Sequence, residues 1–318
     1  MPLSASDALF DGEVQPALLP VCDHYAGNLP YLYKALALQE KLGAVFDITC
    51  DLEDGAASLQ HDATLVLAAE FAGVIASPHN LHGRVGVRVH PVSDARCEAE
   101  LELLLGRSGD QLAFVMQPKA QSLSDVERML QSLRAATVSF SLKKPPALHV
   151  LIETHGALRD VFAIAALRGV ESLSFGLMDF VSAHHGAIPS DAMRSPAQFE
   201  HALVRRAKLE ISAACHTHGK VPSHNVCVDV LNPQQAGADA ARARAEFGYT
   251  RMWSIHPAQI APIIAALAPS SAELAMAARV IDAAQAADWA PISLDGQLHD
   301  RASYRYFWTL LRRTQATH

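Results

Sequence analysis

The stretch that decides the fold is Leu148-His149-Val150-Leu151-Ile152-Glu153-Thr154, an apolar run of β-strand character that ends in a carboxylate. A second apolar run, Gly176-Leu177-Met178-Asp179-Phe180, also carries one. A carboxylate at the tip of a buried strand is costly unless something compensates it, and in a (β/α)₈ barrel that tip is where active sites are built. Either acid alone reads most simply as a solvated loop residue. The pair on neighbouring strands predicts a site for one hard divalent cation such as Mg²⁺.

Outward from this stretch, short β-type runs alternate with helical segments along the chain. Eight strand–helix units in series indicate a parallel sheet with right-handed crossovers. At this length we expect the sheet to close into a (β/α)₈ TIM barrel. The predicted strands are 17–22, 44–51, 84–89, 112–116, 148–154, 172–176, 226–228 and 251–255. The predicted helices are 29–42, 61–75, 95–105, 124–135, 157–167, 196–218, 233–247 and 257–267.

The alternative architecture is an open doubly wound sheet. It predicts a glycine-rich phosphate loop after the first strand. Residues 22–28, CDHYAGN, lack the GxGxxG pattern, so the barrel is favoured.

Beyond the eighth unit, the pattern predicts a helix over 272–287, a loop over 291–300 and an aromatic-rich helix over 304–313. We therefore expect a barrel domain over 1–268 and a C-terminal helical extension over 269–318. A monomer would gain little by exposing the aromatic residues of the last helix. This favours packing of the extension on a neighbouring subunit, and the alternative is packing on its own barrel.

The bulk composition is that of an ordinary soluble enzyme. The chain has 318 residues, 50% of them hydrophobic, and a formal net charge of -7, which argues against nucleic acid as a main partner. Five scattered cysteines without CxxC spacing indicate reduced thiols and a cytoplasmic protein. The acidic N-terminus does not resemble a signal peptide, and no apolar run reaches the ~18 residues of a membrane span.

Polar residues follow most of the predicted strands, at the ends that meet on one face of a barrel. One such residue would mean little, whereas a set converging on one face would form a site. The residues are Asp51, Glu53, Asp54, Arg88, His90, Gln117, Lys119, Glu153, Asp179, His256 and Gln259.

Several of these residues also have simpler structural explanations. Asp54 is equally well read as a helix cap, Lys119 as an exposed lysine, and His256 as a structural histidine before Pro257. Arg88 lies between two valines, so its side chain points to the face opposite theirs. A buried unpaired arginine is improbable, which favours an acidic partner or an anionic ligand for Arg88.

In their order along the chain, the motifs resemble the citrate lyase β-subunit and malyl-CoA lyase or citramalyl-CoA lyase branch of the HpcH/HpaI aldolase family. The resemblance covers nearly the whole chain. The motifs that carry it are Asp51-Leu52-Glu53-Asp54, Arg88-Val89-His90, Pro118-Lys119, Ile152-Glu153-Thr154, Gly176-Leu177-Met178-Asp179 and Ile255-His256-Pro257-Ala258-Gln259.

The resemblance implies a (β/α)₈ barrel, usually in a homotrimer or hexamer, that catalyses reversible Claisen or aldol cleavage. It implies that Glu153 and Asp179 hold Mg²⁺, with Mn²⁺ as a substitute, and that Arg88 contacts substrate oxygens. Asp51 and Glu53 would orient the catalytic site, while Lys119 and His256 would help bind substrate. The late segment Gly296-Gln297-Leu298-His299-Asp300 matches a family motif that reaches a neighbouring subunit's site, so Asp300 would exchange the proton.

The resemblance also implies a small-molecule substrate, namely a β-hydroxyacyl-CoA that yields an α-keto acid and an acyl-CoA. His90 replaces the family's asparagine, and the region around Asp23 is acidic where the family has basic residues for CoA phosphates. These departures leave open an aldolase acting on a free hydroxy-keto acid. A non-catalytic barrel that binds metabolites is the third alternative.

Overall fold

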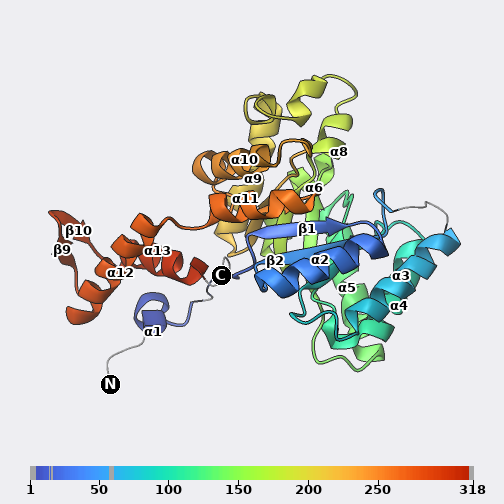
Figure 1. Ribbon diagram of the computed structural model, residues 1–318, viewed down its shortest axis with the longest axis horizontal. Helices are drawn as coiled ribbons and strands as arrows, with labels where there is room; N and C mark the ends of the chain where they lie inside the picture. Colours follow the sequence, from blue (N-terminus) through green and yellow to red (C-terminus); the bar gives the residue numbers. More distant parts are fainter. Residues whose placement is uncertain (1–4, 14, 16, 57–60, 315–318) are drawn as a thin grey trace. The chain divides into compact units, whose positions relative to one another are not determined.

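The computed structural model describes residues 5–13, 15, 17–56 and 61–314. These residues form two compact units (Figure 1). The larger unit spans Leu19–Leu267, and the smaller one combines the residues before Leu19 with those from Ala268 onward. The sequence predicted one barrel domain over 1–268. In the structure, the residues before Leu19 group instead with the C-terminal helices.

The larger unit is a closed barrel of eight parallel strands in sequential order. Pairing of β1 with β8, with Asp23 beside Trp253, closes the sheet. The (β/α)₈ prediction is confirmed. The strands are β1 (Cys22–Ala26), β2 (Phe46–Asp51), β3 (Val85–Arg88), β4 (Phe114–Gln117), β5 (Ala147–Ile152), β6 (Val170–Phe175), β7 (Val221–His224) and β8 (Arg251–Ser254).

Helices lie around these strands (Figure 1). The residues that flank the helix Leu29–Leu42 explain where it begins and ends. Asn28 caps its N-terminus by accepting a hydrogen bond from the Tyr31 amide, and Gly43 ends it at φ 85°. The helices are α2 (Leu29–Leu42), α3 (His61–Ile75), α4 (Arg96–Ser108), α5 (Leu123–Ser139), α6 (His155–Arg159), α7 (Val161–Ala166), α8 (Leu177–Ser182), α9 (Ala202–Thr217), α10 (Pro233–Phe247) and α11 (Pro257–Leu267), with short 3₁₀ turns η1 (Gly109–Gln111), η2 (Ser190–Met193) and η3 (Ala197–Phe199).

Two strands and one apolar run were placed wrongly by the sequence pattern. The first strand is Cys22–Ala26 and not 17–22, and the seventh is Val221–His224 and not 226–228. β1 and β7 both contain buried polar residues. An apolar pattern therefore selects the segments beside these strands and not the strands themselves. Gly176–Phe180 is not a strand either, since β6 ends at Phe175 and the run enters α8.

A buried ion cluster explains why β1 and β2 carry polar residues. The Arg251 guanidinium is fully buried and contacts Asp23 at 2.9 Å and Asp47 at 2.5 Å. Thr49 donates a hydrogen bond to Asp23 at 2.7 Å, and Arg84 pairs with Asp47 at 2.6 Å. Buried charges persist when paired in this way, so the barrel is held partly by ion pairs and not by apolar packing alone.

The smaller unit packs three helices around an apolar cluster. They are α1 (Ala5–Phe10), α12 (Ser271–Ala286) and α13 (Arg301–Arg313). The predicted loop over 291–300 is wrong in part, because it contains an antiparallel hairpin of β9 (Ile292–Leu294) and β10 (Gln297–His299). Asp295 and Gly296 both have positive φ angles, as a tight hairpin turn requires.

The aromatic residues of α13 are largely covered within this unit. Tyr304 is fully buried among residues of α1 and α12, and its hydroxyl donates to the Ala290 carbonyl at 2.8 Å. Phe307 and Trp308 pack partly against the same cluster. Tyr304 is thus covered within this unit and Phe307 and Trp308 are partly covered, whereas Tyr306 of α13 and Leu298 of β10 lie exposed. Packing of the extension on a neighbouring subunit stays a prediction.

One stretch meets the length and hydropathy requirements of a membrane span, contrary to the sequence expectation. It is Pro257–Ala286, 28% of whose apolar window is buried. The stretch comprises two helices, α11 and α12, and α11 contributes Ile260, Ile263 and Leu267 to buried packing. Composition alone is weak support for a membrane span in such a case.

Candidate active site

A pocket of about 120 Å³ brings together three of the predicted site residues, Arg88, Glu153 and Asp179. They come from the ends of β3 and β5 and from the start of α8. The remaining wall consists of Leu151, Phe175, Gly176, Leu177, Met178, Asn225, Val226 and Trp253. The barrel therefore gathers charged residues from distant parts of the sequence on an otherwise largely apolar wall.

Glu153 follows β5 and is held by backbone on two sides. The Lys119 amide donates to its Oε1 at 2.7 Å. Gly176 lies so close that a Cβ there would come within 2.2 Å of Glu153 Oε2. Burial, and next the negative charge of Asp179, raise the pKa of Glu153 to about 7. A carboxylate whose ionisation a neighbouring carboxylate opposes in this way suits a bound cation.

Asp179 does not stand at a strand tip, as the sequence pattern suggested. It lies in the first turn of α8 and is partly exposed. It still reaches the pocket because α8 begins almost immediately after β6 ends, with Gly176 between them.

Arg88 has the acidic partner that its position between two valines led us to expect. Its Nε and Nη2 contact the two oxygens of Asp51 at 2.5 and 2.8 Å, and its Nη1 lies 3.3 Å from Glu53 Oε2. Hydrogen bonding to Asp51 outweighs the effect of burial, so the pKa of Arg88 is raised. The guanidinium is thus permanently charged and fixed in orientation.

Asp51 is fully engaged in positioning its neighbours. Besides Arg88, it accepts hydrogen bonds from the Tyr25 hydroxyl at 2.7 Å and from the amides of Gly55 at 2.8 Å and Glu53 at 3.2 Å. Despite burial, these donors keep the pKa of Asp51 below its ordinary value. Asp51 therefore stays ionised, and its carboxylate fixes the position of the Arg88 guanidinium.

Lys119 is not a freely solvated lysine. Its ammonium pairs with both Glu53 and Asp54, and its backbone amide donates to the Glu153 carboxylate. The φ angle of Lys119 is positive, at 50°. That conformation is uncommon for a residue with a side chain. Lys119 therefore connects the loop after β2 to the carboxylate after β5.

The other predicted residues lie outside the pocket. His256 is exposed, and its Nδ1 accepts a hydrogen bond from the Ala258 amide at the start of α11, as in the structural interpretation. His90 is buried against Glu100, whose carboxylate contacts its Nδ1 at 2.5 Å and its amide at 2.9 Å. Asp300 belongs to the smaller unit, where it caps α13 by accepting from the amides of Ala302 and Ser303.

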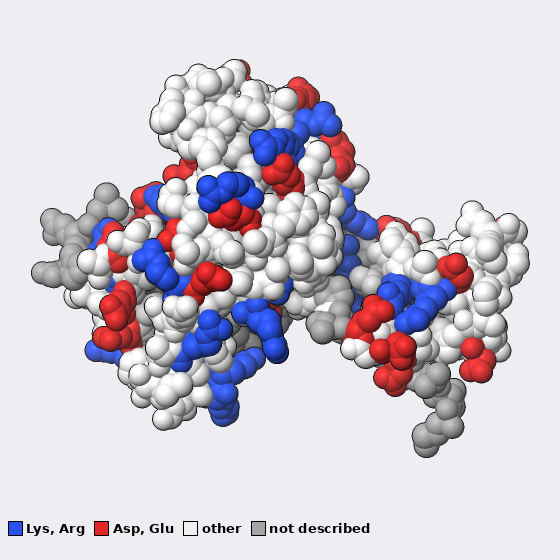
Figure 2. Space-filling view, turned by 180° about the vertical axis from the view of Figure 1, so that it is seen from behind, with Lys and Arg blue, Asp and Glu red and all other residues white. Residues whose placement is uncertain are grey.

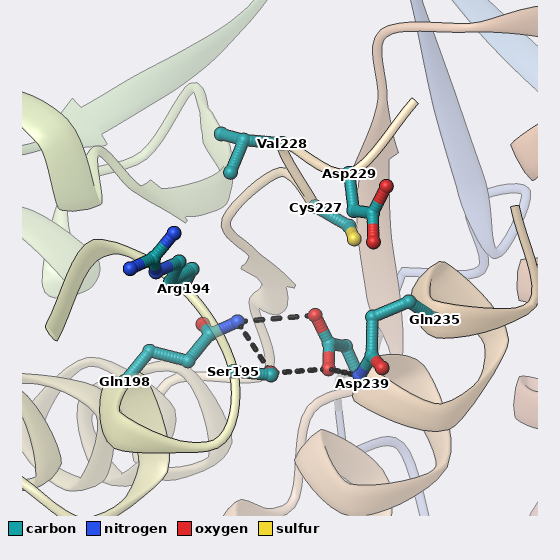
Figure 3. A pocket seen from close by; sticks show the side chains of 8 residues that line it. All are labelled: Arg194, Ser195, Gln198, Cys227, Val228, Asp229, Gln235 and Asp239. Carbon is teal, nitrogen blue, oxygen red and sulfur yellow. Dashed lines mark hydrogen bonds between the residues drawn. The ribbon is translucent and has the colours of Figure 1, made fainter. Parts of the chain in front are cut away.

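A second pocket of about 270 Å³ lies beside residues that follow β7 (Figure 3). Asp239 stands on one side of it and accepts hydrogen bonds from Ser195, Gln198 and Gln235. Gln198 in turn accepts a hydrogen bond from Lys208 at 3.0 Å. Among the sequence patterns, none pointed to this network.

The network reaches the first pocket through Asn225. Lys208 is fully buried and donates to Asn225 Oδ1 at 2.8 Å, and Asn225 lines the pocket with Glu153. Burial lowers the pKa of Lys208 far below its ordinary value. Sequence reasoning missed Trp253 and Asn225, which line the pocket, and Tyr25, which donates to Asp51, because nothing local in their motifs marks them.

The donor set in the first pocket fits a hard divalent cation. Glu153 and Asp179 offer only oxygen atoms, which Mg²⁺ prefers, and Mg²⁺ usually keeps several water ligands. Among the described residues, no group of three or more His, Cys, Asp or Glu side chains stands close enough to enclose a metal. Substrate and water would therefore complete the coordination.

The fold and the site together define the class, a barrel protein with two carboxylates and a fixed guanidinium gathered in one pocket. The chain belongs to the HpcH/HpaI aldolase/citrate lyase family, a family of carbon–carbon lyases, whose sequence model matches residues 34–257. The resemblance in the strand-tip motifs is thus confirmed.

Individual relatives cover nearly the whole chain. A citrate lyase from Burkholderia xenovorans LB400, known from a crystal structure, shares 51% sequence identity with this chain. The match covers 99% of this chain and 96% of that one, with a TM-score of 0.88. The L-malyl-CoA/beta-methylmalyl-CoA lyase of Rhodobacter capsulatus is 26% identical, covering 94% of this chain and 96% of its own. CitE of Mycobacterium tuberculosis, solved with magnesium, acetoacetate and coenzyme A, shares the fold at 23% identity and a TM-score of 0.69, covering 94% of this chain and 99% of its own.

Proposed function

We propose that this protein is a Mg²⁺-dependent lyase that cleaves a β-hydroxyacyl-CoA of the malyl-CoA or citramalyl-CoA type into an α-keto acid and an acyl-CoA. The observation that carries the proposal is the pairing of Glu153 with Asp179 in one pocket beside Arg88. The name of the Rhodobacter relative and the magnesium and coenzyme A bound to the Mycobacterium protein support it.

In this reaction the bond between the carbinol carbon and the α carbon of the thioester breaks. The hydroxyl group gives its proton to a carboxylate acting as general base and becomes the carbonyl of the keto acid. The electron pair of the broken bond becomes a thioester enolate, which then takes a proton at carbon. Charge therefore develops on oxygen twice, and each time a fixed donor lowers the barrier.

The residues present suit these steps. Glu153 and Asp179 would hold the cation, which when bound polarises the oxygens of the keto acid half as a Lewis acid. Arg88, oriented by Asp51, presents its guanidinium to the oxygen on which charge develops. A carboxylic acid is then required to exchange the proton with carbon, and we assign this role to Asp300.

An aldolase acting on a free hydroxy-keto acid is the second candidate. It is favoured by the start of the barrel, where Asp23 is engaged with Arg251 and the region offers no basic residue in place of the family's CoA-binding ones. CoA dependence distinguishes the two candidates.

The test is to incubate purified protein with Mg²⁺ and a panel of hydroxyacyl-CoA esters and to measure released keto acid. Glu153→Gln keeps the size of the side chain and removes the charge, so it should abolish turnover and weaken Mg²⁺ binding while the protein stays folded. Full activity of that variant, or of wild type in excess chelator, would refute the proposal. Cleavage of free hydroxy-keto acids alone would select the second candidate.

We further propose that the enzyme works as a homotrimer or a dimer of trimers, with Asp300 completing a neighbour's site. The exposed Leu298 and Tyr306 of the smaller unit support a subunit contact there. Asp300→Asn is a clean variant, because asparagine caps a helix as well as aspartate does. Mixed oligomers of Asp300→Asn and Glu153→Gln subunits should recover some activity. No recovery despite demonstrated subunit exchange would place Asp300 in its own subunit's site or outside catalysis.

Residence in the cytoplasm remains part of the proposal. All five cysteines are free and buried, as suits a reducing compartment. Localisation of a tagged protein in its native host would test it.

A further inference from the structure

We propose that the backbone N–H of Val226 donates a hydrogen bond to the enolate oxygen that forms when the carbon–carbon bond breaks. This inference rests on the proposed function and adds a catalytic group to it. It follows from the way the peptide between Asn225 and Val226 is held, and from the lack of an acceptor for its N–H.

The segment directly after β7 has its carbonyl groups occupied by side chains. The Asn225 carbonyl lies 3.1 Å from His224 Nδ1, and the Val226 carbonyl accepts a hydrogen bond from Asn225 Nδ2 at 3.0 Å. The Cys227 carbonyl accepts one from Gln259 Nε2 at 2.9 Å. These three contacts fix the course of a backbone segment that lies beyond the end of its strand.

The amides of Asn225 and Val226, in contrast, have no acceptor. Within the described part of the chain, neither N–H makes a hydrogen bond to the backbone or to a side chain. Both residues line the pocket that contains Arg88 and Glu153. Backbone N–H groups away from bulk water are rarely left unpaired, so free amides on a pocket wall indicate a ligand that accepts from them.

The contact with His224 gives the direction of the Val226 N–H. The Asn225 carbonyl and the Val226 N–H belong to one trans peptide, in which the C=O and N–H bonds point to opposite sides. The His224 ring is fully buried and stacks on Phe199 of η3, outside the barrel strands. Because the carbonyl points to His224 behind the wall, the Val226 N–H points to the pocket side.

A buried network holds this peptide from behind. Lys208 contacts His224 Nε2 and donates to Asn225 Oδ1 at 2.8 Å and to Gln198 Oε1 at 3.0 Å. Gln198 in turn donates to Asp239 at 3.0 Å (Figure 3).

The protonation of His224 agrees with its contact to the carbonyl. Burial, and next the charge of Lys208, lower the pKa of His224 well below its ordinary value, so the ring is neutral and carries one N–H. Its Nδ1 faces the Asn225 carbonyl, which has no proton to give, so the ring proton belongs on Nδ1. His224 is therefore a positioning residue that acts through the Asn225–Val226 peptide.

The reaction needs a donor of this kind, because charge develops on two different oxygens. Arg88 does not serve both, since its Nε and Nη2 donate to Asp51 and its Nη1 lies 3.3 Å from Glu53. A fixed N–H that is already in place needs no reorganisation when charge appears on the enolate oxygen. A peptide whose carbonyl accepts a hydrogen bond is also polarised into a stronger donor.

The first experiment removes the N–H and keeps every side chain. Val226 is replaced by the α-hydroxy acid that carries the valine side chain, so that an ester oxygen takes the place of the amide N–H. With Mg²⁺ and the hydroxyacyl-CoA ester that wild type cleaves, we expect kcat to fall roughly 10²-fold. KM should change by less than about twofold, because the donor acts in the transition state. A kcat within about twofold of wild type would overturn the inference.

The matched control is the same replacement at Val228, which is exposed and lines the second pocket. An ester also weakens the preceding carbonyl as an acceptor, and here that carbonyl belongs to Cys227 and accepts from Gln259. The control therefore shares the side chain, the new bond and the weakened acceptor. We expect wild-type kcat, and an equal loss at both positions would refute the role of the Val226 N–H.

A double substitution tests how His224 acts. His224→Phe keeps the stacking on Phe199 and removes the donor to the Asn225 carbonyl, so kcat should fall about tenfold. In the Val226 ester protein the same change should lower kcat by less than about twofold, because no N–H is left to orient. Effects that simply multiply would show that His224 does not act through this peptide.

A binding measurement separates this inference from the proposed function. If wild type cleaves none of the esters, the proposed function fails, and NMR of protein labelled with [¹⁵N]valine decides the inference. The probe is oxalate in Mg²⁺, a planar anion that resembles an enolate. We expect the amide proton of Val226 to move downfield, as a proton does on forming a hydrogen bond to an anion, while that of Val228 stays in place. A Val226 signal that does not move, or that moves together with Val228, would overturn the inference.

Discussion

Replacing Gly176 with alanine should disable the site through a single methyl group. Gly176 has φ -90°, which alanine adopts without backbone strain, so the effect comes from contacts alone. The new Cβ would lie 2.2 Å from Glu153 Oε2 and 2.5 Å from Glu153 Cβ.

The size of the effect follows from the overlap. Real Cβ atoms essentially never approach another heavy atom within 3.0 Å, so the carboxylate must retreat by about 0.8 Å. A displacement of about 1 Å at a catalytic group costs roughly 10² in rate, and overpacking a filled site costs about 1–3 kcal/mol of stability. We therefore expect kcat to fall about a hundredfold and the Mg²⁺ half-saturation concentration to rise.

The assay is keto acid release across a Mg²⁺ titration, with urea unfolding measured in parallel. Gly73→Ala is the matched control, because Gly73 lies within α3 and an added Cβ meets nothing within 4 Å. That change should leave activity intact and stabilise the helix by about 0.5–1 kcal/mol. Wild-type turnover and Mg²⁺ response in Gly176→Ala would show that the position of Glu153 does not matter, and would refute the assignment of the cation site.

Two further changes probe the guanidinium and a buried histidine. Arg88→Lys should reduce kcat by roughly 10²–10³ with the circular dichroism spectrum unchanged, because lysine cannot provide the planar fork that Asp51 orients; a variant within about twofold of wild type would place Arg88 outside the site. Burial lowers the pKa of His24 to about 4, so below its ordinary value near 6.5 only the unfolded state gains the proton and stability falls as pH falls. From pH 7 to 5 His24 should cost about 2 kcal/mol of unfolding free energy. In urea unfolding, His24→Gln should lose about 2 kcal/mol less stability than wild type between pH 7 and pH 5. Identical pH dependence of stability in the two proteins would show that His24 does not cause the loss.

The barrel was predictable because six of its strands are apolar runs of ordinary appearance between recognisable helices. β1 and β7 were misplaced because the barrel interior accepts Asp23 and His224, and strand patterns based on apolar residues then select the neighbouring loops. Asp179 was assigned to the wrong element, yet it reaches the expected pocket because α8 begins directly beyond β6.

The residues that complete the site were beyond the reach of sequence patterns. Tyr25 contacts Asp51 across 26 residues, and Lys208 contacts Asn225 across 17. Such contacts depend on which strands become neighbours, and no local motif records that. Trp253 lies in the predicted eighth strand, where an aromatic residue indicates only packing.

The ion cluster around Arg251 bears on how the barrel folds. Arg251 belongs to the last strand, and its partner Asp47 lies 204 positions earlier, so during synthesis Asp23 and Asp47 are made long before Arg251. A partly assembled sheet lacking β8 can still pair Asp47 with Arg84 but would have to leave Asp23 hydrated or protonated. Removing one partner from a buried ion pair lowers the stability of the folded protein by about 3–5 kcal/mol. A barrel that closed with fewer strands, or with β1 paired to a strand other than β8, would bear that loss. The last strand to emerge thus carries the charge that selects the correctly closed barrel over its incomplete competitors.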